Sequence, residues 1–263
     1  TVIDISHSIL SLFIEDIFMN QTSLKSLKIS HCGITIIKVG VFQDLTSLAD
    51  LDISYNAGIQ LRFGTFLGLN NLKQLNLSFS EMDNLEIGIF FGLDNLHLLD
   101  ISNNEISTLE VGIFDGLNSI KILNISQNSI STLGVGVFGA ICTENFNSTC
   151  EMSYMYSQYC NMSHVLVTLT YLDLSHNEIT HIHPHTFINC INLEKLDLSY
   201  NEMFKFDTQF LNTPALRTLI VNNCNINRLP IAVFGCTRKL SDIQLSFNKI
   251  QKYYGRMTKR SNV

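Results

Sequence analysis

Apolar and polar residues follow one another in short blocks that return about every 24 residues along the chain. The block from Ile120 to Ile130 is apolar at its first, fourth, sixth and eleventh positions and has Asn128 at its ninth. The alternation at the fourth to sixth positions points successive side chains to opposite faces, which predicts a short β-strand. A partial block begins at Ile3, and further blocks begin at Leu24, Leu48, Leu72, Leu96, Ile120, Leu169, Leu193, Leu216 and Leu240.

A column of phenylalanines accompanies the blocks at Phe18, Phe42, Phe66, Phe90, Phe114, Phe138, Phe187, Phe210 and Phe234. One block cannot bury its apolar edge alone, so neighbouring blocks are expected to stack into a parallel sheet over a continuous core. The asparagine column can hydrogen-bond to neighbouring turns inside that core. Because each unit is longer outside the strand than within it, the stack should curve with its strands on the concave side.

The phrase LxxLxLxxNxL resembles the leucine-rich repeat consensus, and the resemblance covers nearly the whole chain. The 24-residue length with its phenylalanine resembles the extracellular "typical" subclass of Toll-like receptors, variable lymphocyte receptors and adhesion proteins. The resemblance implies an α/β solenoid, a curved horseshoe with a parallel concave β-sheet and an irregular or 3₁₀ convex side. It also implies a non-catalytic extracellular module that binds ligand on a concave or lateral surface, of the innate-immune or cell-surface signalling type.

The expected organisation is a single solenoid of about ten repeats over residues 1–250, followed by a basic tail at 251–263 that has lost the pattern. The pattern also fails at 142–166, which is either a degenerate repeat or an inserted loop; its composition favours a disulfide-tied insert. The simplest interpretation of the tail is a disordered end. Neither end carries a cysteine-rich capping domain, so we expect this chain to be part of a longer ectodomain.

Cysteines and glycosylation acceptors indicate an extracellular or cell-surface location. Cys32 and Cys224 lie in the asparagine column and Cys190 in a leucine column, so buried thiols are expected there. The disulfide candidates lie in the 142–166 segment, with their pairing left open: Cys142, Cys150 and Cys160. The N-glycosylation acceptors are Asn20, Asn76, Asn124, Asn147 and Asn161.

Three columns are expected to line the concave face: mostly Asp or Asn, then mostly Ser, then a mixture of His, Tyr, Phe, Asn and Gln. An acidic strip beside an aromatic strip suits a protein or peptide with basic and apolar groups. Alternatively, Leu-Asp-Leu-Ser is a generic strand phrase that serves solubility and sheet geometry. The ligand-binding candidates are His31, Tyr55, Phe79, Asp100, Tyr171, Asp173, His176, Tyr200, Arg217 and Phe247. Glycans on Asn76 and Asn124 would cover the middle of the groove and move binding to a flank, to the C-terminal strands or to the insert.

Other chemistry is not indicated. The net charge of −6 argues against nucleic-acid binding. The GVGVFG stretch at 134–139 matches G-x-G-x-x-G, but its Gly136 belongs to a repeat column and no strand leads through it into a long helix, so neither an enzyme nor a cofactor is expected. In the HIHPH segment at 181–185, Ile182 fills a core column, so a metal site is not expected. The expected partner is a protein or peptide ligand, with a homodimer left open and membrane attachment only through segments outside this chain. The alternatives are an adhesion or matrix protein, a hormone-receptor ectodomain, and an intracellular repeat scaffold.

Overall fold

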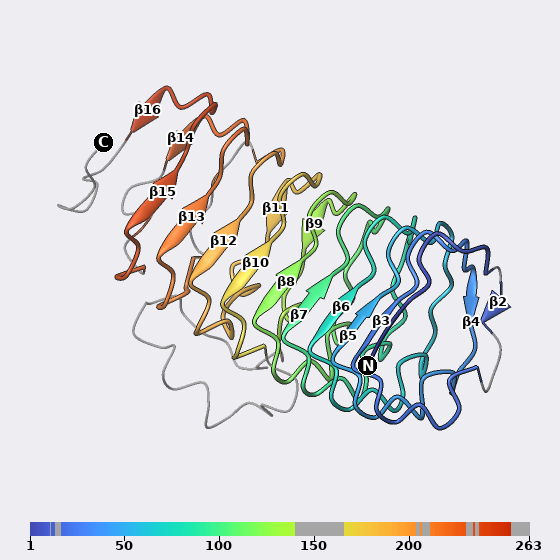
Figure 1. The fold of residues 1–263 in the computed structure, drawn as a ribbon. Coiled ribbons are helices and arrows are strands. Elements are labelled where there is room, and N and C mark those ends of the chain that lie inside the picture. The colour runs from blue at the N-terminus through green and yellow to red at the C-terminus, as the bar shows by residue number, and fades with distance from the viewer. Residues whose placement is uncertain are drawn as a thin grey trace.

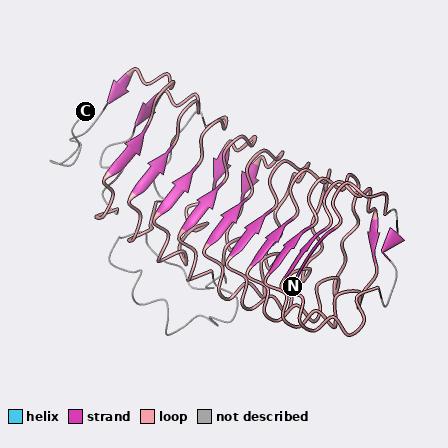
Figure 2. Cartoon of the chain, viewed as in Figure 1, coloured by secondary structure: helices cyan, strands magenta, loops and turns pink. Residues whose placement is uncertain are grey.

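The computed structural model describes residues 1–10, 12–13, 17–139, 166–203, 206, 211–229, 234 and 237–253. Each block contributes one three-residue strand to a ten-stranded parallel sheet (Figures 1 and 2). The curved solenoid predicted from the period is confirmed. The strands of the sheet are, in order, β1 (Val2–Asp4), β3 (Ser26–Lys28), β5 (Asp50–Asp52), β6 (Gln74–Asn76), β7 (Leu98–Asp100), β8 (Ile122–Asn124), β10 (Tyr171–Asp173), β12 (Lys195–Asp197), β13 (Thr218–Ile220) and β15 (Asp242–Gln244).

The register of the sheet follows the repeat. Leu75 of β6 lies opposite Leu99 of β7, and Leu123 of β8 lies opposite Leu172 of β10. The sheet therefore continues directly from β8 to β10, although the two paired leucines are 49 positions apart in the sequence. Residues 140–165 are outside the described part of the chain, so the insert at 142–166 stays a prediction; Leu166, at its end, is buried.

The convex side consists of turns joined by two-residue strands. These strands form three small parallel pairs: β2 (Leu12–Phe13) with β4 (Ile36–Ile37), β9 (Thr132–Leu133) with β11 (His181–Ile182), and β14 (Arg228–Leu229) with β16 (Lys252–Tyr253). The turns carry hydrogen bonds from a backbone N–H to the carbonyl three residues earlier, as from Leu45 to Phe42. The irregular convex side is thus as predicted, while the described residues form no 3₁₀ helix. Across the same described residues, there is no helix with the length and apolar character that crossing a membrane requires.

The interior is a stack of leucine and phenylalanine layers. Neighbouring rings of the phenylalanine column lie nearly parallel, with centroids 6.5 Å apart between Phe42 and Phe66 and 5.6 Å apart between Phe138 and Phe187. Full burial of a side chain of this size contributes about 1.5–3 kcal/mol. Phe210 is outside the described residues; the buried members of the column are Phe18, Phe42, Phe66, Phe90, Phe114, Phe138, Phe187 and Phe234.

In six of the units, an asparagine after the strand joins its unit to the preceding one, while Cys32, Ser80 and Cys224 hold this position in three others. The Oδ1 of Asn104 accepts hydrogen bonds from the backbone N–H groups of Ser80 and Met82, at 3.0 and 3.1 Å. Its Nδ2 donates to the carbonyls of Leu77 and Ile101, at 3.1 and 3.0 Å. Both ends of the amide are therefore satisfied inside the core, as buried polar groups require. The same bridging role falls to Asn56, Asn128, Asn177, Asn201 and Asn248.

Cysteine replaces asparagine in this column at two places and keeps only the donor function. The Sγ of Cys32 donates to the carbonyl of Ile5, and the Sγ of Cys224 donates to that of Leu198. Cys190 is fully buried in a leucine column. The three predicted buried thiols are confirmed, and burial raises the pKa of Cys190 to about 12.

Replacement of Asn128 by alanine tests the asparagine column. Loss of its amide leaves the buried N–H of Ile106 without its partner and removes one of the two bonds at the carbonyl of Ile101, which keeps the bond from Asn104. We expect unfolding to become easier by about 2–4 kcal/mol, measured as the shift of the urea transition. Asn128→Cys should cost less, because a thiol can still donate. Asn118→Ala, at an exposed asparagine, is the control, and an equal shift for Asn118→Ala and Asn128→Ala would contradict this role.

Thiol labelling tests the packing of the cysteines. In the native chain, Cys32, Cys190 and Cys224 should resist iodoacetamide at pH 8, because all three are buried away from the reagent. Burial also raises the pKa of Cys190 and of Cys224, which disfavours the reactive thiolate at these two positions. All three should react after unfolding in guanidinium chloride. Peptide mapping by mass spectrometry measures the labelling at each position. Rapid modification of Cys190 under native conditions would show that the leucine layers are not closed around it.

Candidate functional site

After seven of the ten strands, an Asp or Asn of the acidic column accepts a hydrogen bond from the serine two residues later. The Oδ1 of Asp52 accepts from the backbone N–H of Ser54 at 3.0 Å and from its hydroxyl at 2.7 Å. Asn76 accepts in the same way from Ser78, at 3.1 and 2.8 Å. At each of these positions, one side-chain oxygen therefore stabilises the bend of the backbone at the end of the strand.

The prediction that the serine column lines the concave face is wrong for six central units. Their serines are 3–8% exposed, because the chain bends after the three-residue strand and turns the serine inward. The acidic and aromatic columns remain on the surface. The buried serines are Ser54, Ser78, Ser102, Ser126, Ser175 and Ser199.

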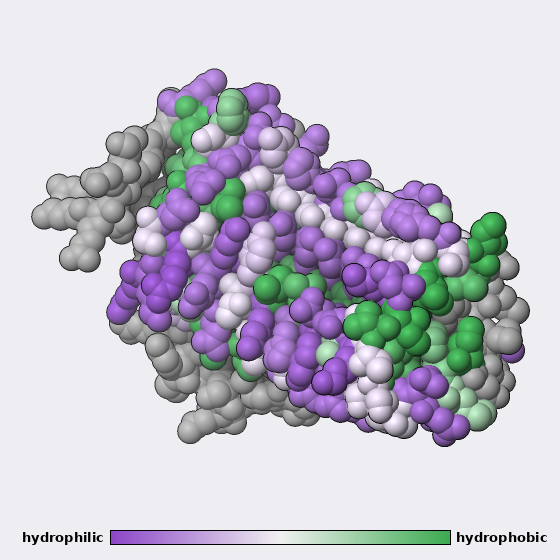
Figure 3. Space-filling model, in the orientation of Figure 1, coloured by the Kyte–Doolittle hydropathy of each residue, from purple (hydrophilic) through white to green (hydrophobic). Residues whose placement is uncertain are grey.

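A hollow of about 450 Å³ lies over strands β3, β5, β6 and β7. Its polar lining includes the carboxylates of Asp50, Asp52 and Asp100, the ammonium group of Lys28 and the amide of Asn76. Figure 3 shows hydrophilic side chains over most of the face in view, with the largest hydrophobic group toward the N-terminal end and smaller ones near the centre and the C-terminal end. With three carboxylates against one ammonium group, the hollow favours a positively charged group.

Exposed rings stack at the ends of β1, β3, β5 and β6, three of which lie under the hollow. Centroids lie 4.4 Å apart between His7 and His31, 4.1 Å between His31 and Tyr55, and 4.3 Å between Tyr55 and Phe79. Tyr55 and Phe79 are each 42% exposed. The four rings form a continuous stack, which we call the aromatic ladder. It offers a flat apolar edge next to the acidic hollow.

The backbone conformation of this column is unusual for residues other than glycine. All ten residues of the column, from His7 to Phe247, have φ between 53° and 62°. This left-handed conformation costs roughly 1–2 kcal/mol for most side chains. It is held here by backbone bonds between units, such as the 2.9 Å bond from the N–H of Tyr55 to the carbonyl of Ser78. The repeat thus maintains a strained turn in every unit at the position that carries the rings.

A second group of candidates lies in the C-terminal half. The hydroxyl of Tyr171 donates to Oδ2 of Asp173 at 2.8 Å, and Nζ of Lys195 lies 4.4 Å from the centre of the Tyr171 ring. Burial, followed by the bond to Asp173, raises the pKa of Tyr171. The rings of His176 and Tyr200 stack at 4.1 Å. These contacts join four of the predicted residues in two pairs, which together we call the Tyr171 patch; the acid of the first pair is already engaged by Tyr171.

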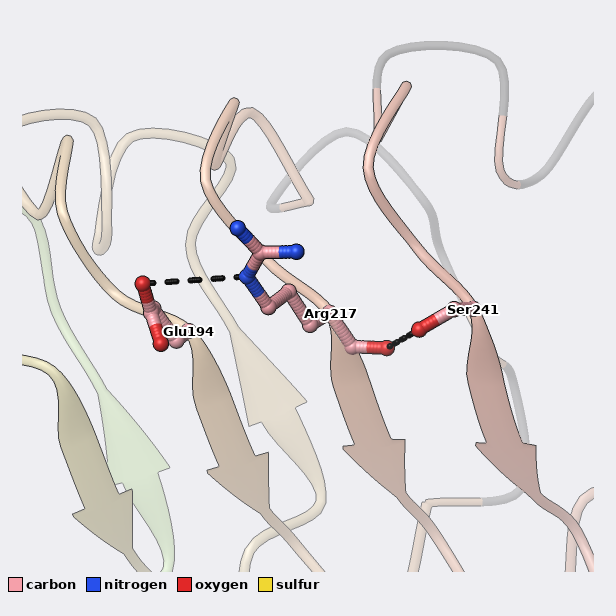
Figure 4. A network of polar contacts seen from close by, with 3 residues as sticks. All are labelled: Glu194, Arg217 and Ser241. Atoms are coloured by element: carbon pink, nitrogen blue, oxygen red, sulfur yellow. Dashed lines mark hydrogen bonds and ion pairs between the residues drawn. The ribbon is translucent and has the colours of Figure 1, made fainter.

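Arg217 and Phe247 do not join either group through contacts in the described structure. Arg217 points toward Glu194 on the neighbouring unit, with 3.7 Å between Nε and Oε1, while its carbonyl accepts from the Ser241 hydroxyl (Figure 4). Both charged side chains are more than half exposed, so the pair contributes little to stability. Phe247 is 83% exposed near the end of the sheet.

Several residues of the acidic hollow and the ladder were not among the predicted ligand-binding candidates. His7 extends the ladder, and Lys28, Asp50 and Asp52 line the hollow. The sequence could have identified His7, Lys28 and Asp52, because each lies in one of the columns expected on the concave face. Asp50 lies two residues before Asp52 and shares its side of the strand, so the period of two could have identified it.

The predicted glycosylation acceptors occupy different environments. Asn20 is exposed, whereas Asn76 lines the hollow. Nδ2 of Asn124 donates to Oδ2 of Asp100 at 3.2 Å, so a glycan there would replace a contact within the acidic column. Asn147 and Asn161 are outside the described residues, as are the predicted disulfide cysteines Cys142, Cys150 and Cys160.

In the histidine-rich segment at 181–185, Ile182 lies in the core, as its place in a core column predicted. The rings of His183 and His185 meet edge to face at 5.4 Å. Burial, with a smaller effect from the two neighbouring histidines, lowers the pKa of His183. In the part of the chain that the structure describes, no three potential ligands among His, Cys, Asp and Glu are grouped to hold a metal ion.

Known proteins with related sequences are repeat proteins. The profile of the Leucine rich repeat family matches residues 22–82, 70–130 and 164–212, more than half of the chain. Lumican from Coturnix japonica and lumican from Gallus gallus are each 32% identical to the chain over 119 residues, which are 43% of this chain. The match spans about a third (34%) of each lumican.

Solved structures show the same architecture. The TLR13–ssRNA13 complex superposes with a TM-score of 0.72 at 25% identity, covering 85% of this chain and 29% of TLR13. The leucine-rich repeat domain of APL1B gives 0.65 at 20% identity, covering 98% and 73%. An internalin from Listeria monocytogenes gives 0.54 at 18% identity, covering 91% and 66%.

These proteins and the stacked units place the chain in a class whose members typically act as non-catalytic interaction modules. The chain therefore belongs to the leucine-rich repeat family and is a protein-binding repeat module.

Proposed function

We propose that the chain is the ligand-recognition region of an extracellular receptor. Its concave face binds a protein or peptide segment that carries basic groups beside apolar ones. The observation that carries this proposal is the acidic hollow over β3, β5, β6 and β7 together with the aromatic ladder, three rings of which lie at the ends of β3, β5 and β6. The two features belong to adjacent units of one rigid sheet, so a single extended segment can reach both.

The chemistry of the two features is complementary. Carboxylates from Asp52 and Asp100 attract a lysine or arginine and speed its approach at low ionic strength. The rings of Tyr55 and Phe79 offer apolar contact area that is already ordered by stacking, so little side-chain entropy is lost on binding. Recognition therefore uses a preformed surface and needs no chemical step.

RNA is a weaker candidate ligand for this surface. TLR13, whose solved structure is a complex with ssRNA13, raises the possibility, and exposed rings can stack on bases. However, nucleic-acid sites track phosphates with Lys and Arg, and the hollow here holds three carboxylates and one lysine. The net charge of −6 also disfavours binding of the negatively charged RNA backbone.

A matrix or adhesion role is the second candidate, and the similarity to lumican favours it. The receptor and matrix candidates share the binding surface and differ in what the complete protein contains. The sequence of the full-length chain separates them. A membrane span followed by a signalling domain supports the receptor, and a secreted protein without a span supports the matrix role.

Asparagine substitutions test the acidic hollow. Asn76 and Asn124 hold the same column as Asp52 and Asp100, so Asp→Asn removes charge while keeping the bond to the following serine. Short peptides selected from a random phage library on the immobilised chain should be rich in Lys or Arg with aromatic or aliphatic residues. D52N/D100N should weaken their binding about tenfold by surface plasmon resonance.

The matched control is D173N/D197N, which removes two charges of the same column in the C-terminal half. It should leave the affinity of the selected peptides within about twofold, since exposed charges beyond a Debye length are screened. A larger loss in D173N/D197N than in D52N/D100N would move the binding site to the Tyr171 patch. Selection of acidic peptides, or equal binding by all variants, would contradict the proposal.

Secretion from animal cells tests the extracellular proposal. We expect the intact mass of the secreted chain to fall on enzymatic deglycosylation, because Asn20 is an exposed acceptor. If Asn76 also carries a glycan, N76D should strengthen binding of the selected peptides by clearing the hollow and adding a carboxylate. A glycan-free chain with all cysteines reduced would contradict an extracellular location.

A further inference from the structure

The convex side carries an apolar stripe that the concave binding site does not use. Val39, Phe63, Ile87 and Val111 repeat every 24 residues and are 53, 52, 57 and 47% exposed. A second column four residues further on adds Leu67 and Phe91, at 37 and 57%. Large exposed apolar side chains at equivalent positions of successive units are unusual on a surface that faces only water.

The stripe is continuous from unit to unit. The rings of Phe63 and Phe91 lie 6.0 Å apart. A Cβ atom added to Gly88 would lie 3.1 Å from the Phe63 ring, and one added to Gly64 would lie 3.2 Å from Val39 and 3.3 Å from Leu67. Glycine in these units therefore lets side chains of neighbouring units close over the backbone and form one patch.

Charged residues directly precede the first apolar column, and their sign reverses halfway along it. Lys38 and Arg62 are basic, whereas Glu86 and Glu110 are acidic. Arg62 lines a hollow of about 430 Å³ with Lys38 and another of about 570 Å³ with Glu86. Neither Arg62 nor Glu110 takes part in an ion pair among the residues that the structure describes.

The order of residues is self-complementary about the middle of the patch. The charged column reads basic, basic, acidic, acidic. The outer column reads polar, apolar, apolar, polar, through Gln43, Leu67, Phe91 and Asp115. A two-fold dimer requires one patch to complement itself when it is turned end over end. Both columns meet this requirement, with apolar side chains at the centre and polar ones at the rim, as in protein interfaces.

We propose that this convex patch binds a second copy of the chain in an antiparallel, two-fold arrangement. The axis passes between the Phe63 and Ile87 units. Arg62 then faces Glu86 of the second copy, and Lys38 faces its Glu110, each pairing occurring twice. Around the axis, Phe63 packs against Ile87 of the second copy, and Leu67 packs against its Phe91. The dimer leaves both concave faces open, so this inference does not depend on the proposed ligand site.

Charge-reversal variants test the arrangement. K38E/R62E makes all four charges acidic, and E86R/E110K makes all four basic. Sedimentation velocity should show a concentration-dependent dimer for the unmodified chain that weakens with added NaCl. Each variant alone should raise the dimer dissociation constant more than tenfold. An equimolar mixture should dimerise again, because every basic position of one variant then faces an acidic position of the other.

R228E/K249E, which reverses two basic residues in the C-terminal units, is the control and should dimerise like the unmodified chain. Recovery in the mixture also shows that both variants are folded, which matters because Glu86 accepts a bond from the N–H of Phe63. Circular dichroism of each variant provides a second check. A chain that stays monomeric at its highest soluble concentration, or variants that fail to rescue each other although folded, would overturn the proposal.

Discussion

The bond between each buried asparagine and the preceding unit is the interaction on which the solenoid depends. A unit of about two dozen residues has an apolar edge that it cannot cover alone, and its neighbours must lie at a constant distance to cover it. The asparagine amide sets that distance by bonding both units at once, as Asn104 does with Leu77 and Ile101. Asn177 bonds to Ile125 and Ile130, although each of these two residues is more than 45 positions away from Asn177 along the chain. The contact is therefore made by stacked units, whatever the length of chain between them.

Constant spacing turns single residue positions into surface columns. A ring at the position of Tyr55 stacks on a ring at that of Phe79 because the backbone brings them to 4.3 Å. The same spacing gathers carboxylates into one hollow on the concave side and apolar side chains into one patch on the convex side. Each surface is thus built by repetition, and its binding character depends on which residues occupy one column over three or four units.

The concave and convex faces differ in the kind of partner that they suit. On the concave side, the left-handed backbone at every ring position is held by bonds between units, so the ladder is ordered before a ligand arrives. On the convex side, the patch centred on Phe63 and Ile87 combines exposed apolar area with charges whose order reverses. The first surface suits a segment of another protein, and the second suits a copy of itself. Both can be occupied together because they lie on opposite sides of the coil.

The period of the chain was sufficient for the fold, because a 24-residue repeat of Leu, Asn and Phe can bury its apolar positions only by stacking. It was also sufficient for the burial of Cys190 and Ile182, which share columns with core residues. Only the tertiary structure decided which residues next to the core columns are exposed to solvent. The serines turn inward because a three-residue strand bends at its end, where alternation no longer applies. Likewise, Phe63 and Phe91 resemble core residues in the sequence, yet the convex turn places them outside, since side-chain direction in a turn follows the local φ and ψ and not the repeat.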